Sequence, residues 1–204
     1  MPKASTRSRW LLPLVLIAIV LPLAMFVPRW PYDPEVARFI QRLPLPAGFA
    51  AWLTSLAGKP VVYGVLGTGL LLATWRGRLK GLVATAVLML LWWYGGEPLK
   101  EVVHRARPTA EFVEVVRPAS GFSFPSTFAT TWFSAWMPLA IYAFRTRQRD
   151  AGLAISIVAW VLVLLGAWAR VRMGAHWPSD LLMTLALVWS TFTLIELAVD
   201  RLDG

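Results

Sequence analysis

The sequence predicts an all-α polytopic membrane protein with six membrane-spanning helices, and three observations lead to this fold class. The chain has 204 residues, 57% of them hydrophobic, a balance that soluble domains rarely tolerate. Its apolar residues gather into runs without Asp, Glu, Lys or Arg, and a bilayer requires ~20 such residues per helix. Compact basic clusters occupy alternate loops between these runs. With no low-complexity linker and no internal repeat, residues 1–204 are expected to form a single membrane-embedded domain.

The six predicted spans follow the charge-free runs. The first and fourth are long enough alone, whereas the second, third and sixth are short and are expected to borrow flanking residues such as 52–57. The first run exceeds a typical signal-peptide core of about 7–15 residues and lacks a small-x-small cleavage site, so we expect a retained helix. The runs are 10–28, 60–75, 81–96, 122–144, 151–169 and 181–195.

A short helix is predicted between the first two spans. Asp33 and Pro34 resemble a helix start, with Asp as the N-cap and Pro at the first position. The apolar residues that share one face of this helix are Val36, Phe39, Ile40 and Leu43. We expect an amphipathic helix on the outer membrane surface, which is either a lateral lip for a lipid or a plain structural connector.

The distribution of charge predicts orientation. The net charge of +9 lies in compact loop clusters, which argues against nucleic-acid binding and, by the positive-inside rule, places both termini in the cytoplasm. The remaining loops are basic too, so their charges are expected to have a separate task. The cytoplasmic clusters are Lys3/Arg7/Arg9, Arg76/Arg78/Lys80 and Arg145/Arg147/Arg149, and the other cations are Lys100, Arg105, Arg107, Arg117, Arg170 and Arg172.

Three of these other cations, Lys100, Arg107 and Arg170, are candidates for binding a phosphate. An isolated arginine near a bilayer commonly extends to the lipid headgroups, but three cations beside a His–Asp pair favour a phosphoryl site. A transferring phosphoryl group spreads its charge over three equatorial oxygens, which positioned cations stabilise. Arginine can bind two of these oxygens at once, while lysine acts as a point charge.

Ser126 and Thr127 follow Pro125 at the start of the fourth span. The free backbone N–H groups at a helix start attract phosphate. A serine there either caps the helix or donates to the anion, and the sequence leaves both roles open.

His176 and Asp180 are spaced i, i+4 near the start of the last span, which brings them to one helical face. A carboxylate that holds one imidazole nitrogen fixes the tautomer and leaves the other nitrogen free to attack. The alternatives are a metal site, for which two histidines and no cysteine give few soft ligands, and a purely structural histidine.

These residues form three ordered motifs: Lys100 with Arg107-Pro108, then Pro125 to Phe128, then Arg170 with His176 and Asp180. The chain thus resembles the type 2 phosphatidic acid phosphatase family, relatives of vanadium haloperoxidases, whose signature is K-x6-RP, PSGH and SR-x5-H-x3-D. The resemblance extends from residues 53–58 to the last span. It implies a bacterial inner-membrane protein with six spans and an active site facing the periplasm.

Carried over residue by residue, the resemblance implies that His176 is the nucleophile, forming a phosphohistidine, and that Asp180 orients it. The residues that would hold the phosphate are Lys100, Arg107, Ser126, Thr127 and Arg170. No metal or other cofactor is implied, because the cations already neutralise the phosphate.

Three positions depart from the family pattern. Ala169 replaces a serine, and Thr127 adds a side chain where glycine leaves room for phosphate. Phe128 replaces the histidine that would protonate the leaving oxygen, and such general-acid catalysis is typically worth ~10²–10⁴-fold. His104 is the only other imidazole, and it is either a substitute acid or a surface histidine without a catalytic task.

The expected function is a membrane phosphatase or phosphotransferase that acts on a lipid phosphate or pyrophosphate, with water or a second lipid as acceptor. By family analogy, candidate substrates are polyprenyl pyrophosphate, phosphatidylglycerol phosphate, phosphatidic acid and phosphorylated lipid A. The alternative is a family member impaired by Phe128 that binds or presents a phosphorylated lipid.

Overall fold

The computed structural model describes residues 6–148 and 151–202, and within these ranges it contains seven α-helices and no strand. The prediction of an all-α fold is confirmed. The helices are α1 (Thr6–Phe26), α2 (Asp33–Arg42), α3 (Ala47–Ser55), α4 (Val61–Val103), α5 (Thr127–Arg145), α6 (Gly152–Arg172) and α7 (Pro178–Leu202).

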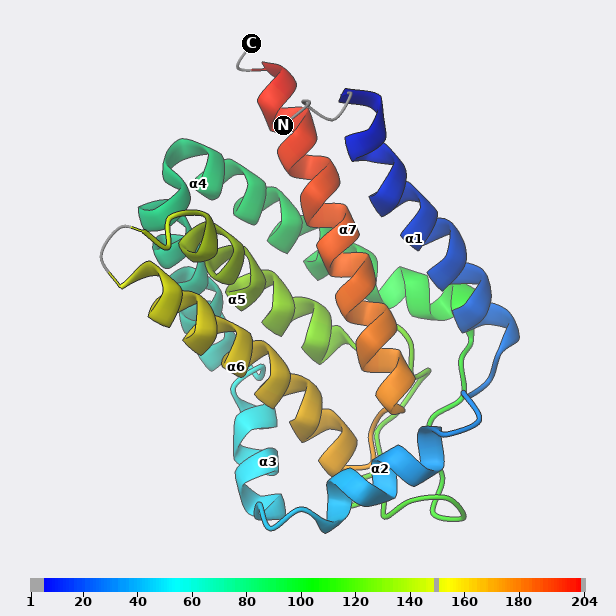
Figure 1. Cartoon of the computed structure of the whole chain (residues 1–204). Helices are drawn as coiled ribbons and strands as arrows, with labels where there is room; N and C mark the ends of the chain where they lie inside the picture. Colours follow the sequence, from blue (N-terminus) through cyan, green and yellow to red (C-terminus); the bar gives the residue numbers. More distant parts are fainter. Residues whose placement is uncertain (1–5, 149–150, 203–204) are drawn as a thin grey trace.

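The long helices form a bundle around α5, the helix with the most buried residues, which packs against α4, α6 and α7 (Figure 1). Helix α1 lies beside α7 on the outside of the bundle. Among the described residues, α1, α4, α6 and α7 are long and apolar enough to cross a membrane, judged by length and composition alone.

Helix α4 contains both the second and the third predicted spans. Its 43 residues are interrupted at Arg78, whose φ of 54° and ψ of −143° are not helical, so the element bends back as two limbs. A Cβ on Gly81 would lie 2.3 Å from the carbonyl oxygen of Ala73, so only glycine lets the two limbs come this close.

Two further boundaries differ from the sequence prediction. Residues 52–57 do not extend the second span, because α3 ends at Ser55 and a turn separates it from α4. Helix α5 begins at Thr127, five residues after the start of the apolar run, because Ser126 has extended backbone geometry and acts as its N-cap.

The start of α1, the bend of α4 and the junction of α5 with α6 lie at the same end of the bundle as the end of α7 (Figure 1). Ion pairs join three of these elements: Lys80 with Asp200 at 2.6 Å, and Arg145 with Glu196 at 2.5 Å. Arg9, Lys80 and Arg145, one from each predicted basic cluster, line one pocket at this end. Lys3 and Arg149 lie outside the described residues, and the Arg7 side chain is likewise not described.

The opposite end carries α2, α3, the long segment 104–126 and the connection from α6 to α7 (Figure 1). Helix α2 begins at Asp33, one residue before the predicted first position at Pro34, and it packs against α6 and α7. However, its buried residues are Asp33, Pro34 and Ala37, while Val36 and Phe39 are 42% and 64% exposed. Asp33 does not cap its own helix but binds the start of α7.

Candidate active site

His176 lies in the short connection between α6 and α7 and is almost completely buried. Its Nε2 lies 3.3 Å from a guanidinium nitrogen of Arg107 and 3.2 Å from one of Arg170. Arginine can only donate hydrogen bonds, so Nε2 is the acceptor and the ring proton belongs on Nδ1. The lone pair of Nε2 therefore points at the two cations that the sequence predicts for phosphate binding.

The charge state of His176 follows from its surroundings. Burial, and then the positive charges of Arg170, Arg107 and Lys100, lower the pKa of the imidazole well below its ordinary value. At neutral pH the ring is therefore uncharged, which is the form that can act as a nucleophile.

Asp180 lies on the other side of the imidazole, at the start of α7. Its Oδ2 accepts a hydrogen bond of 2.8 Å from the backbone N–H of Trp177 and lies 3.7 Å from Nδ1 of His176. The i, i+4 spacing thus brings His176 and Asp180 together, although their separation is longer than a hydrogen bond and their interaction is electrostatic. Asp180 also closes the first turn of α7, so it fixes the loop that carries His176.

That loop depends on Gly174. Its φ of +67° is a left-handed conformation, and a Cβ there would lie 2.1 Å from the carbonyl oxygen of Glu114. The backbone N–H of Val116 donates to the carbonyl of Met173 at 3.2 Å and holds the two segments together. Segment 104–126 therefore packs directly on the loop that presents His176.

Arg107 is oriented before any substrate binds. Its guanidinium donates to the carbonyl oxygens of Ser120, Gly121 and Ala175 at 2.7–3.2 Å. These four bonds fix the plane of the guanidinium beside His176. Burial lowers the pKa of Arg107, and the carboxylates of Asp180 and Glu97 oppose this effect.

Lys100 is buried near the end of α4 and joins the first two motifs. Its Nζ donates 2.8 Å to Oε1 of Glu97 and also contacts Oγ1 of Thr127. Thr127 in turn donates 2.7 Å to the same oxygen of Glu97. The three side chains form a closed triangle between α4 and the first turn of α5.

Ser126 is fully buried, and its hydroxyl accepts a hydrogen bond of 3.3 Å from the backbone N–H of Ala129. Its own N–H donates to the hydroxyl of Thr184, also at 3.3 Å. The capping role left open by the sequence is thus present, and the contact of Ser126 with phosphate stays a prediction.

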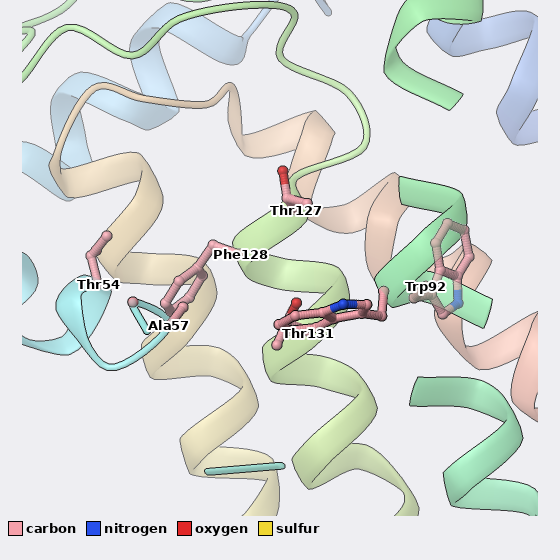
Figure 2. A pocket seen from close by; sticks show the side chains of 8 residues that line it. Thr54, Ala57, Trp92, Thr127, Phe128 and Thr131 are labelled. Atoms are coloured by element: carbon pink, nitrogen blue, oxygen red, sulfur yellow. The ribbon is translucent and has the colours of Figure 1, made fainter. Parts of the chain in front are cut away.

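Phe128 lies between the phosphate cations and an aromatic cavity. Its ring stacks on Trp132 with centroids 5.6 Å apart, and the Arg170 guanidinium lies 5.5 Å from the ring centroid. Figure 2 shows the ring pointing from α5 toward Thr54 and Ala57 at the end of α3, while Thr127 points away from them. This cavity of about 360 Å³ also borders Trp92 and Trp93 of α4.

His104 lies apart from this arrangement. It ends α4 in a left-handed conformation (φ 55°), is exposed, and packs its ring edge-on against Phe122 at 4.3 Å. Its Nδ1 is 3.4 Å from the carbonyl of Val102, so its contacts are local. This position favours the surface histidine over the substitute acid.

A single protein-family model matches the region that contains all three motifs. The model of the PAP2 superfamily matches residues 79–202, which is more than half of the chain and includes all three motifs. The chain belongs to the PAP2 superfamily. The family predicted from the motifs is therefore confirmed, and the matched region runs from the second limb of α4 to the end of α7.

Individual PAP2 proteins are also similar. Phosphatidylglycerophosphatase B of Escherichia coli strain K12 is 31% identical over 85 residues, and the Shigella flexneri protein of the same name gives the same values. The match covers 42% of this chain and 32% of the relative, so the chain spans about one third of the length of these relatives.

The fold is shared with a solved structure. The crystal structure of a transmembrane PAP2 type phosphatidylglycerolphosphate phosphatase from Bacillus subtilis has a TM-score of 0.69 and covers 95% of this chain and 98% of that chain, at 20% identity. Together with the apolar helices, this makes the chain an all-helical, multi-pass PAP2 membrane protein.

Sequence reasoning missed two residues that support the PAP2 site. Arg105 is completely buried and donates to Oδ1 of Asp180 at 2.8 Å, to the hydroxyl of Ser179 at 2.9 Å and to the carbonyl of Pro28 at 3.1 Å. Asp33 accepts from the N–H and hydroxyl of Ser179 at 2.9 and 2.5 Å. In the sequence Arg105 is one loop cation among several, and its position two residues before the Arg107-Pro108 pair is the signal that links it to the site.

Proposed function

We propose that this chain is a membrane phosphatase or phosphotransferase that transfers a phosphoryl group from a lipid phosphate or pyrophosphate through a phosphohistidine on His176. The observation that carries the proposal is the meeting of Arg107 and Arg170 at Nε2 of a buried, uncharged imidazole. A phosphate that binds both guanidinium groups has its phosphorus next to the nitrogen that attacks.

The residues divide the chemistry between them. Lys100, Arg107 and Arg170 stabilise the charge on the equatorial oxygens of the transferring group. Nε2 of His176 forms the bond to phosphorus as the bond to the leaving oxygen breaks, and the proton on Nδ1 stays beside Asp180. Water or a second lipid then takes the phosphoryl group and regenerates the neutral imidazole.

The arrangement of the helices also supports a proposal for the membrane topology. We propose six spans, formed by α1, the two limbs of α4, α5, α6 and α7, with α2 at the membrane surface. The basic clusters at one end support a cytoplasmic location for that end and a periplasmic location for the site, in a bacterial inner membrane. The whole chain then acts as one lipid phosphatase domain.

The substrate is proposed to be a lipid with a terminal phosphate. The relatives are named for phosphatidylglycerophosphate, which makes this lipid the first to test. The cavity beside Phe128 combines aromatic rings with threonine hydroxyls, a mixed lining that suits the part of a lipid nearest its headgroup. Phe128 itself favours a pyrophosphate, because the phosphate that leaves requires no proton donor.

A second candidate is a protein that binds or presents phosphorylated lipid without turnover. The observation that favours it is Phe128, which occupies the position of the general acid and cannot donate a proton. The cations and the aromatic cavity would serve such a binder equally well.

One experiment separates the two functions. Phosphate release from a panel of lipid mono- and pyrophosphates is measured in detergent micelles for the wild type, His176→Ala and Asp180→Asn, together with binding of each lipid. We expect His176→Ala to abolish release and retain binding, and Asp180→Asn to lower release less severely. Binding without release by the wild type, or unchanged release by His176→Ala, would establish the binder or another mechanism instead.

A further inference from the structure

Glu97 belongs to none of the three motifs, yet it touches two of them. It lies in α4 one turn before Lys100, and its Oε1 accepts hydrogen bonds from Lys100 at 2.8 Å and Thr127 at 2.7 Å. Its side chain is 61% exposed, whereas that of Lys100 is 8% exposed. A carboxylate is therefore held at the open side of the phosphate cations.

A simple ion pair within α4 does not account for this arrangement. An i, i+3 pair needs only Lys100 as partner, but here Thr127 on α5 binds the same carboxylate oxygen and fixes its position from a second helix. Thr127 is also the residue that replaces the family glycine, so this departure supplies the hydroxyl that holds Glu97.

The carboxylate also interacts with the charge of Arg107, whose guanidinium is 3.3 Å from Nε2 of His176. Glu97 is thus linked to two of the cations around His176, Lys100 by a hydrogen bond and Arg107 by charge. A negative charge at this place repels an incoming phosphate, so it weakens substrate binding. A role in a later step of the reaction, after the substrate has bound, would explain why a carboxylate lies at this position.

The reaction has a step that needs such a group. When water attacks a phosphohistidine, one of its protons must be accepted, and Phe128 provides no imidazole for this purpose. His104 packs against Phe122 on the surface instead. Glu97 is the acceptor that the described contacts place among the phosphate-binding residues.

We propose that Glu97 is the general base of the second half-reaction, an inference that rests on the proposed phosphohistidine mechanism. In the first half, the bond from Nε2 to phosphorus forms and the leaving phosphate departs as an anion, so no acid is needed. In the second half, Glu97 takes a proton from water as the oxygen–phosphorus bond forms. The bond from phosphorus to Nε2 breaks, and Nε2 recovers its lone pair.

Rapid-quench kinetics with a lipid pyrophosphate labelled on its terminal phosphate test this role. Glu97→Gln keeps the oxygen that binds Lys100 and Thr127 but removes the base. We expect a burst close to one equivalent of phosphohistidine at a rate near that of the wild type, followed by turnover reduced ~10²-fold or more. Glu97→Asp should retain part of the turnover. The matched control is Glu101→Gln, an exposed carboxylate one residue beyond Lys100, which should behave as the wild type.

Each other outcome overturns the proposal in a recognisable way. A slower burst and a higher KM without accumulation of phosphohistidine would show that Glu97 only positions Lys100. Unchanged turnover would show that it has no part in the reaction. Failure of the underlying mechanism is visible separately, because His176→Ala would then turn over as the wild type does.

Discussion

At the scale of single residues, the contrast between His176 and Phe128 distinguishes this chain. Nε2 of His176 faces Arg107 and Arg170, and the lowered pKa keeps the imidazole uncharged. Phe128 occupies the position at which the family motif has a histidine, and its ring stacks on Trp132 and lies 5.5 Å from the Arg170 guanidinium. The proposed mechanism therefore predicts a preference among leaving groups, which can be measured.

Phe128→His tests this preference. A lipid alkoxide is a poor leaving group and needs a proton, whereas a departing phosphate, with a second pKa of about 6, does not. We expect the wild type to favour a pyrophosphate over the matched monophosphate lipid in kcat/KM. The histidine should raise monophosphate turnover by ~10-fold or more and change pyrophosphate turnover far less.

The control is Phe128→Leu, which alters the cavity without adding an acid and should leave the ratio of the two substrates unchanged. Equal gains on both substrates with Phe128→His would contradict the hypothesis. So would a wild type that already prefers the monophosphate.

The lowered pKa of His176 predicts the pH dependence. The neutral form is favoured in the folded protein, so the acid limb of kcat/KM that belongs to this group should lie below pH 6.5. Above pH 6.5 His176 is neutral in both the folded and the unfolded protein, so its titration does not change the free energy of unfolding. Below pH 6.5 the unfolded protein binds the proton more readily, so stability falls as the pH falls. Nitrogen-15 NMR of His104→Gln, which leaves one histidine, reports the titration directly. A midpoint at or above 6.5 would refute the assignment.

At the scale of elements, a buried network connects the surface helix α2 to the start of α7. Asp33 of α2 binds Ser179, Arg105 binds Ser179 and Asp180, and Asp180 lies beside His176. The carboxylate that the sequence assigns to the cap of α2 is therefore connected, through Ser179 and Arg105, to the loop that carries His176.

Asp33→Ala should disturb both folding and catalysis. It leaves Arg105 with one fewer buried carboxylate nearby and Ser179 without its acceptor, and removing one partner of a buried pair typically costs about 3–5 kcal/mol. We expect a lower thermal unfolding temperature and a lower kcat. Glu35→Gln in the same helix breaks only an exposed pair with Arg38 and should change stability by less than ~1 kcal/mol. Equal effects of the two variants would count against the network.

The sequence predicts the positions of the long helices better than it predicts the contacts between elements. Charge-free runs located the long helices, because membrane burial constrains composition over ~20 residues. They did not reveal that residues 52–55 form the end of α3 and that 56–57 begin a turn, since a turn inside an apolar stretch leaves composition unchanged. Motif spacing predicted that His176 and Asp180 lie together, and the structure brings them to 3.7 Å, while their catalytic roles stay a prediction. The contacts of Arg105, Asp33 and Glu97 could not be predicted, because they depend on partners from other elements.

At the scale of the whole molecule, the bend of α4 and the end of α7 lie at the end of the bundle opposite α2, the segment 104–126 and the connection from α6 to α7 (Figure 1). Arg76, Arg78 and Lys80 belong to the bend of α4, whereas Arg107 and His176 belong to the segments at the other end. This separation predicts the orientation in the membrane. A cysteine introduced at Gln148 should be protected from an impermeant thiol reagent in intact cells, and one at Thr109 should be labelled. The chain has no native cysteine, so the background is low. Labelling at Gln148 but not at Thr109 would reverse the orientation.

The ion pairs at the end away from the site have a mechanical consequence. Glu196 of α7 binds Arg145 of α5 with two hydrogen bonds and lies 3.6 Å from Lys80, just after the bend of α4, while Lys80 also binds Asp200. Helices α4, α5 and α7 are thus held together by ion pairs at the end away from His176. These ion pairs are expected to restrain the three helices most strongly at that end. Amide hydrogen exchange should accordingly be slowest near Lys80, Arg145 and Glu196 and faster toward the opposite end of the same helices.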